Sequence, residues 1–120
     1  MHNLENNLIN TLKTKSDWVR LSTLEMVINA GSGHLGGSFS VADILVSLLY
    51  NPELNFFEGE DKDRIILSKG HSSLSIYPIL ADKQLINIEE LSNYNQSGSI
   101  LGGHPDTRVP GIEITTGSLG

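Results

Sequence analysis

The sequence contains no cysteine among its 120 residues. This absence excludes disulfide bridges, thiol catalysis and thiolate metal sites, and it fits a reducing compartment. The sequence also lacks any apolar run near the roughly 20 residues of a membrane-spanning helix, and its polar N-terminus does not have the composition of a signal peptide. We therefore expect a cytoplasmic protein with no membrane partner.

Basic residues are scarce. Eight Lys and Arg stand against 14 Asp and Glu, so the net charge is −6 and the isoelectric point is near 5.0. Nucleic acids and anionic membranes are bound through basic surfaces, and this composition argues against both as general partners. The hydrophobic content of 38% is compatible with an ordinary packed core.

Glycine is common by contrast, with 12 residues, and it directly precedes three of the four histidines. Glycine weakens regular structure and lets a backbone approach a neighbour closely. The three Gly-His pairs therefore contain the candidate functional residues, which are His34, His71 and His104. The fourth histidine, His2, follows the first residue and has no comparable setting.

Two helices are predicted in the first half of the chain. Apolar residues recur at helical spacing over 3–29, which predicts one long amphipathic helix or two in sequence. Ser40 and Asp43 have the spacing of a capping box, which predicts that a further helix over 41–50 opens there. Pro52 follows and predicts its end.

The second half of the chain is predicted to hold shorter helices and a long loop. A helix is predicted over 72–83, bent or delayed by Pro78. Asn87 is placed to cap a helix over 88–94. Glycine and proline then punctuate residues 95–111, which predicts a loop.

Strand signals are few. The clearest is 64–68, a short β-branched segment, and 112–120 is a doubtful strand that runs into a glycine turn. The order strand, glycine turn, helix is typical of α/β proteins, and a parallel sheet needs several strands covered on both faces. We therefore expect the opening segment of a larger α/β domain with a parallel sheet, mostly helical within these 120 residues. A complete, mainly helical small domain is the alternative.

Three interpretations of the Gly-His pairs compete. A propeller repeat is rejected, because the intervening segments are helical and Trp18 is the only tryptophan. A catalytic zinc ion can be held by three histidines, but these have no local chelate spacing, so the zinc signal is weak. Loops with exposed amides beside helix starts suit phosphate groups, and histidine can donate to a phosphate or shuttle a proton. One such pair alone would be an incidental turn, whereas three favour an anion or cofactor pocket.

Four stretches in the same order resemble the N-terminal, thiamine-diphosphate-binding domain of transketolase, from about Trp18 to Gly120. They are "GSGHLGGSFSVADIL", "RIILSKGHSSLSIYPIL", "GGHPD" and "GIEITTGSLG". The family usually has proline where this chain has Leu35, and often where it has Ser118. "GHLGGS", "SKGH" and "TGSLG" are more similar to the split transketolases, whose N- and C-terminal halves are separate polypeptides. The last motif differs from that of the deoxyxylulose phosphate synthases.

The resemblance implies roles for the histidines. His34 would line the substrate channel near the first carbons of the donor sugar, and His104 would lie beside the reacting carbon of thiamine diphosphate. These two are the expected catalytic residues. His71 would contact the cofactor diphosphate. Asp106 occupies a position that is often glutamate, and no role is carried over to it.

The resemblance also implies the rest of the cofactor site. Gly117, Ser118 and Leu119 would bind the cofactor on its pyrimidine side. The family holds the diphosphate through Mg²⁺ or another divalent cation, usually with an Asp-Gly-Asp…Asn segment. This segment is not found in the 120 residues, so no metal ligand is assigned to the chain. We expect residues 1–120 to be a partial domain that stops before that motif.

The implied function is transfer of a two-carbon ketol group from a ketose phosphate to an aldose phosphate, as in the pentose phosphate pathway of carbohydrate metabolism. The implied assembly is a homodimer or a pair with a C-terminal transketolase subunit, and the 120 residues alone are expected to be inactive. Two alternatives stay open. One is a transketolase-like enzyme of a specialised sugar pathway, and the other is a non-catalytic remnant or binding module that pairs with a longer partner.

Overall fold

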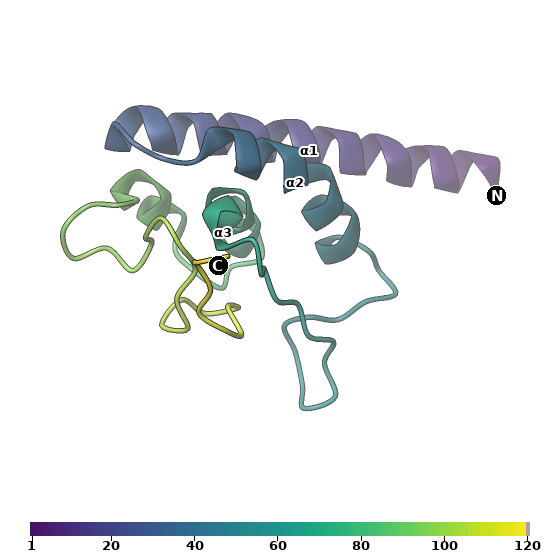
Figure 1. The fold of residues 1–120 in the computed structure, drawn as a ribbon. Helices are drawn as coiled ribbons and strands as arrows, with labels where there is room; N and C mark the ends of the chain where they lie inside the picture. Colours follow the sequence, from purple (N-terminus) through teal and green to yellow (C-terminus); the bar gives the residue numbers. More distant parts are fainter. Residues whose placement is uncertain (120) are drawn as a thin grey trace.

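Residues 1–119 are described by a computed structural model, in which helices provide all the regular structure of this range (Figure 1). The elements in chain order are α1 (His2–Ala30), α2 (Leu35–Leu49), the 3-10 helix η1 (Gly70–Ser72), α3 (Ser73–Asp82) and the 3-10 helix η2 (Ile88–Asn93). The expected content, mostly helical, is confirmed. Gly120, the last residue of the expected glycine turn, lies outside the described residues.

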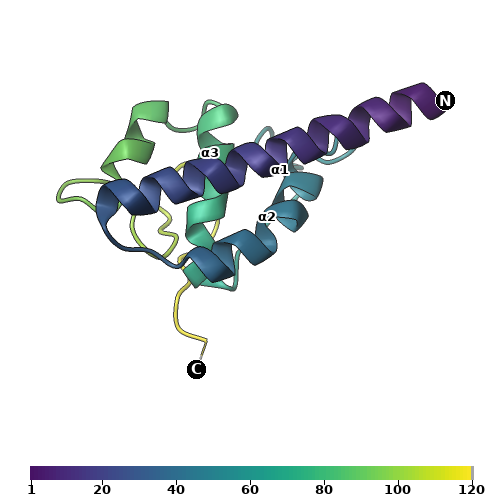
Figure 2. The same ribbon diagram turned by 90° about the horizontal axis from the view of Figure 1, so that it is seen from above.

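Helix α1 is one continuous helix, as the first of the two sequence alternatives proposed. Its C-terminal half buries Val19, Thr23 and Met26 against the other helices. Its N-terminal part projects beyond the body of the molecule in two perpendicular views (Figures 1 and 2). The first apolar side chains of the expected amphipathic face are therefore not packed against the other helices. Leu4 is 74% exposed and Leu8 is 42% exposed.

Helix α3 is the centre of the fold and is buried from Ser73 to Ala81. Pro78 lies inside this helix and has no N–H to give to the carbonyl of Leu74, one turn earlier. The hydroxyl of Thr23 in α1 donates to that Leu74 oxygen at 3.2 Å. A partner from the neighbouring helix thus satisfies a buried acceptor that the proline leaves open.

Helix α2 begins at Leu35, which corrects the predicted start at the capping box. Neither member of the box caps a helix. The Ser40 hydroxyl donates to the Gly37 carbonyl oxygen at 3.0 Å inside the first turns, and Asp43 accepts from Arg20 of α1 at 2.8 Å. The helix ends at Leu49, ahead of Pro52, as predicted.

The two predicted strands lie side by side but form no sheet. Arg64 donates to Glu113 at 2.8 Å, and the Thr116 hydroxyl donates to the Leu67 carbonyl oxygen at 2.6 Å. Both contacts join residues 49 apart in sequence, so the segments run in the same direction. Within residues 1–119 no backbone hydrogen bond joins them, and a ladder is what defines strands. The expected parallel sheet is therefore not formed in this part of the chain.

The remaining predictions concern residues 83–111. Asn87 precedes a 3-10 helix rather than an α-helix, and its backbone carbonyl, not its side chain, accepts the Glu90 N–H at 3.0 Å. Residues 95–111 are irregular, as predicted. No helix within residues 1–119 is both long and apolar enough to cross a bilayer.

Candidate functional site

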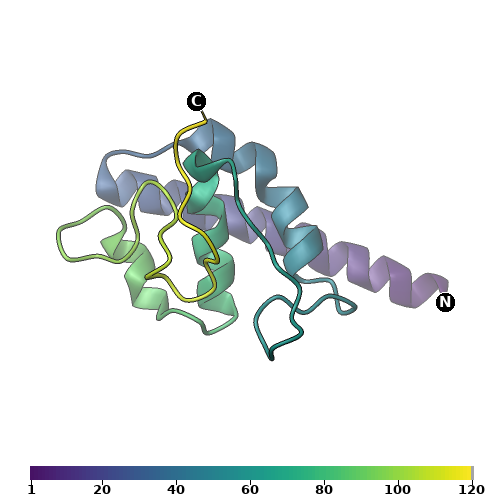
Figure 3. The ribbon, with the colours of Figure 1, turned by 60° about the horizontal axis from the view of Figure 1, so that its bottom comes forward.

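The three histidines that follow glycine meet at one end of the molecule. The ring centroids of His34 and His71 are 5.0 Å apart, those of His71 and His104 are 4.8 Å apart, and those of His34 and His104 are 6.1 Å apart. The start of α2, the start of α3 and the C-terminal segment come together at this end (Figure 3). We call His34, His71 and His104 the histidine cluster. Because the three rings converge, the interpretation of the Gly-His pairs as unrelated surface turns is excluded.

His34 is positioned by the short link between α1 and α2. Gly33 has a φ of 151°, and a Cβ on it would lie 2.6 Å from Val27 Cγ2 and 2.9 Å from Leu74 Cδ1. Glycine is thus required where the chain passes over α3 and turns into α2. His34 occupies the N-cap position of α2. His34 itself is exposed, whereas Leu35 and Gly37 of the same stretch are half-buried.

His71 is the middle residue of η1 and is half-buried. Its loop is fastened to the first turn of α2 by two side chains that share the Gly37 carbonyl oxygen. Ser72 Oγ donates to it at 3.1 Å and Lys69 Nζ at 3.2 Å. Lys69 also donates to Ser40 Oγ at 2.9 Å. These contacts tie the His71 loop to the helix that follows His34.

The C-terminal segment passes directly behind this loop. A Cβ on Gly70 would lie 2.8 Å from the backbone of Thr116 and Gly117. Only a glycine permits this approach, because neither partner atom is a flexible side-chain end. Gly117 in turn lies against the His104 ring, since a Cβ on it would be 3.4 Å from His104 Cδ2.

His104 is exposed and belongs to a loop held by buried hydroxyl groups of α3. The Tyr77 hydroxyl donates toward the carbonyl oxygens of Gly102 at 2.7 Å and His104 at 3.2 Å, and Ser73 Oγ donates to Gly103 O at 3.0 Å. Burial raises the pKa of Tyr77 to about 12, so it remains a donor at neutral pH.

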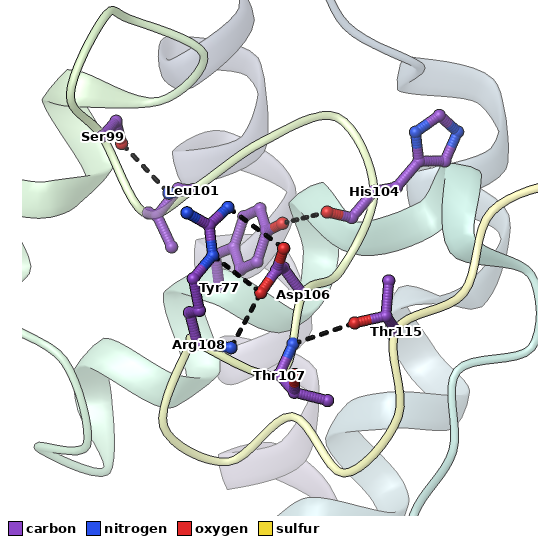
Figure 4. A network of polar contacts seen from close by, with 8 residues as sticks. All are labelled: Tyr77, Ser99, Leu101, His104, Asp106, Thr107, Arg108 and Thr115. Carbon is purple, nitrogen blue, oxygen red and sulfur yellow. Dashed lines mark hydrogen bonds and ion pairs between the residues drawn. The ribbon is translucent and has the colours of Figure 1, made fainter.

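The polar groups after His104 form a local turn. Asp106 accepts three hydrogen bonds from Arg108, one from its backbone N–H and two from its guanidinium (Figure 4). The Arg108 hydrogen bonds hold the pKa of Asp106 below its usual range. Thr107 N–H donates to Thr115 Oγ1 at 3.1 Å. The His104 ring points away from this network in Figure 4, so Asp106 is a loop residue here and not a member of the cluster.

A comparison with known protein families identifies the family of this chain. Residues 11–120 match the family described as transketolase, thiamine diphosphate binding domain. The chain belongs to this transketolase family. The match starts somewhat before Trp18, where the motif resemblance begins.

Similar curated proteins include two named as transketolase subunits. The apulose-4-phosphate transketolase subunit of Phocaeicola vulgatus is 36% identical over 116 residues, which cover 93% of this chain and 41% of that protein. The 6-deoxy-6-sulfo-D-fructose transketolase subunit SqwG of Clostridium sp. is 37% identical over 118 residues, with 91% and 41% covered. The chain thus spans less than half the length of these relatives.

A solved transketolase has the same fold over most of the chain. The structure from Campylobacter jejuni matches with a TM-score of 0.80 and 34% sequence identity, covering 91% of this chain and 18% of that one. The helical arrangement of this chain therefore occurs within a larger transketolase structure.

The predicted cofactor residues of this transketolase-family chain differ in setting. His71 and Gly117 lie at the cluster, as described above. Ser118 and Leu119 continue from Gly117 and are exposed in residues 1–119. Tyr77 and Thr116, which fasten the site's backbone, were not predicted from the sequence. Hydroxyl groups beside motif residues are the only hint that sequence offers for such roles.

The chemistry of the cluster can be stated from its atoms. It consists of three imidazoles, and no Asp or Glu within residues 1–119 joins the group. Imidazole can donate to phosphate oxygens and exchange protons with hydroxyl groups near neutral pH. This donor set suits a phosphorylated ligand and does not suit Mg²⁺, which prefers oxygen ligands.

Proposed function

We propose that this chain is part of a thiamine-diphosphate-dependent enzyme that transfers a two-carbon ketol group from a ketose phosphate to an aldose phosphate. The observation that supports it is the convergence of His34, His71 and His104, with Gly117 against the His104 ring, in a chain of the transketolase family. Segments far apart in the sequence have to meet for this arrangement, which a set of incidental turns would not require.

The residues present fit the cofactor. Gly70 and Gly117 let the C-terminal segment pack directly against the His71 loop and the His104 ring, which holds residues 117–119 beside the cluster. His71 is half-buried on a loop fastened to α2, so its ring can donate to the diphosphate from a fixed position. Gly117, Ser118 and Leu119 would line the pyrimidine side.

The two exposed imidazoles have the catalytic roles in this proposal. Thiamine diphosphate, when bound, supplies the electron sink for cleavage of a ketose carbon–carbon bond. His104, whose loop Tyr77 and Ser73 hold, would move protons at the donor hydroxyl groups, and His34 would hold the sugar in the channel. Both rings are accessible to a sugar from solvent.

The proposed enzyme needs further parts. The Mg²⁺ ligands and the glutamate that activates the cofactor would come from outside residues 1–120, either further along the polypeptide or from a partner. The assembly in question is either a homodimer or a pair with a C-terminal subunit. The names of two relatives as transketolase subunits favour the second.

A specialised sugar substrate is the second candidate. The two relatives named as subunits carry the names of apulose-4-phosphate and of 6-deoxy-6-sulfo-D-fructose. These names favour a ketose outside the usual pentose phosphates. A comparison of ketol transfer from a common ketose phosphate and from these sugars would distinguish the two candidates.

The proposed division of labour predicts different effects of two substitutions. His71→Ala should weaken thiamine diphosphate binding roughly 10- to 100-fold, the loss of a hydrogen bond to a charged group. His104→Ala should lower turnover while leaving that affinity nearly unchanged. Calorimetric titration with thiamine diphosphate and Mg²⁺, together with steady-state ketol transfer by the complete assembly, measures both. His2→Ala, at the far end of α1, is the control.

Two outcomes would contradict the proposal. Equal effects of both histidine substitutions on affinity and turnover would refute the division of labour. Thiamine diphosphate binding with no ketol transfer by the complete assembly would favour the non-catalytic alternative. The 120 residues by themselves should show no transfer.

A further inference from the structure

The histidine cluster also has the composition of a transition-metal site. Each imidazole offers one ring nitrogen, and these atoms all lie within 4.8 Å of one another. The sequence alone gives only a weak zinc signal, because the histidines have no chelate spacing along the chain. We propose that His34, His71 and His104 together bind one Zn²⁺ ion. This inference does not rest on the proposed function.

The geometry requires only a small adjustment. In a tetrahedral site with Zn–N distances of about 2.0–2.1 Å, the ligand nitrogens are about 3.4 Å apart. The most distant pair therefore has to approach by roughly 1.4 Å, which side-chain rotation can supply. The rings of His34 and His104 are exposed and have room to rotate. The His71 plane meets theirs at 78° and 80°, so His71 does not stack on either ring and all three edges stay available to an ion.

The backbone under the cluster is fixed before any metal binds. The Gly37 carbonyl oxygen accepts from Ser72 and Lys69, which joins the His34 and His71 loops. The Tyr77 hydroxyl holds the His104 loop by donating toward the carbonyl oxygens of Gly102 and His104. A site whose ligands need side-chain rotation alone loses little conformational entropy on binding.

The ligand type determines which cation fits. Imidazole nitrogen suits Zn²⁺, Cu²⁺ and Ni²⁺, whereas Mg²⁺ takes oxygen ligands. The three histidines leave the fourth tetrahedral position open to water or an anion. The site therefore discriminates against the cation that the proposed function needs, so the two metals can be tested separately.

The test is a titration of the 120-residue chain with Zn²⁺ alone, and with Mg²⁺ alone, in a buffer that does not chelate. We expect one Zn²⁺ per chain and no Mg²⁺ binding in this range. His34→Gln and His104→Gln should each weaken Zn²⁺ binding by more than the roughly 10- to 100-fold that loss of an outer-sphere partner costs. His2→Gln removes the remaining histidine and should leave the affinity unchanged. Co²⁺ in place of Zn²⁺ should give the intense visible absorption of a tetrahedral site.

Any of three results would contradict the proposed zinc site. The cluster variants could bind Zn²⁺ with the same affinity as the wild type, or His2→Gln could weaken Zn²⁺ binding as much as they do. The wild type could also bind Mg²⁺ as tightly as Zn²⁺. Circular dichroism checks that each variant folds, and the two cluster variants are placed at the exposed histidines, His34 and His104, where folding is least at risk. Because no thiamine diphosphate is present, failure here leaves the cofactor titration above unaffected.

Discussion

Replacing Gly70 with alanine tests whether the site depends on the close approach of the C-terminal segment. A Cβ at Gly70 would lie 2.8 Å from Gly117 N and from Thr116 C, and 2.9 Å from Gly117 Cα. Normal carbon contacts begin near 3.5 Å, so the segment has to move by about 0.7 Å. Backbone atoms cannot turn aside as a side-chain end can, and the whole segment has to shift.

The expected cost follows from two terms. Overpacking a tight contact costs about 1–3 kcal/mol. The Thr116 hydroxyl donates to Leu67 O at 2.6 Å, and a shift away from it loses a bond worth about 1 kcal/mol. The lower backbone entropy of alanine in the unfolded chain offsets about 0.4–1 kcal/mol. We expect Gly70→Ala to lower the free energy of unfolding by about 2 kcal/mol.

Urea unfolding followed by circular dichroism measures this loss, which corresponds to a midpoint roughly 1 M lower. Gly36→Ala is the matched control, because a Cβ on Gly36 meets nothing within 4 Å and the residue lies in the first turn of α2. The control should be neutral or stabilising by up to about 1 kcal/mol. Equal midpoints for the two variants would refute the close approach.

Two further positions, a surface ion pair and a buried hydroxyl group, test what single side chains contribute to stability. Asp82 accepts from Lys15 at 2.6 Å and from the Tyr50 hydroxyl, and although burial raises its pKa, these hydrogen bonds bring it below the ordinary value. Asp82→Asn should therefore cost about 1 kcal/mol above pH 5, and the difference from wild type should shrink as the pH falls through the folded pKa. A difference in urea unfolding that does not change with pH would contradict this. Ser38 is fully buried, and within residues 1–119 its hydroxyl has no hydrogen-bond partner. Ser38→Ala should therefore raise the free energy of unfolding by about 1 kcal/mol. Ser72→Ala is the control and should lower it, because this substitution removes an equally buried hydroxyl that does donate a hydrogen bond. Urea midpoints in the reverse order would count against this account.

The helices could be predicted to the extent that local spacing determines them. The long apolar repeat predicted α1, and the helix predicted over 72–83 is α3, which has Pro78 inside it. The start of α2 was wrong because Ser40 and Asp43 have tertiary partners, in Lys69 and Arg20, that compete with capping. A capping box in sequence cannot show whether its side chains are already engaged elsewhere.

The strand predictions failed for a different reason. Residues 64–68 alternate between exposed and half-buried positions, as a strand on a helical layer should. A strand also needs backbone partners, however, and 112–116 reaches this segment through side chains only. Local sequence shows the extended conformation and cannot show the partner.

The site was predictable as a set of residues but not as a geometry. Three glycine-flanked histidines at element boundaries predicted a pocket, and their rings meet as predicted. Nothing in the spacing of His34, His71 and His104 predicts ring nitrogens within 4.8 Å, because three separate loops bring them there.

Main-chain oxygens accept the hydrogen bonds that hold the segments of the site together. Gly37 O accepts from Ser72, Gly102 O from Tyr77 and Leu67 O from Thr116. Every residue type carries the same carbonyl group, so loop side chains other than the donors Ser72 and Thr116 can be exchanged in evolution without loosening this frame. New ligand preferences can then arise by drift in the loops while the helices below stay as they are.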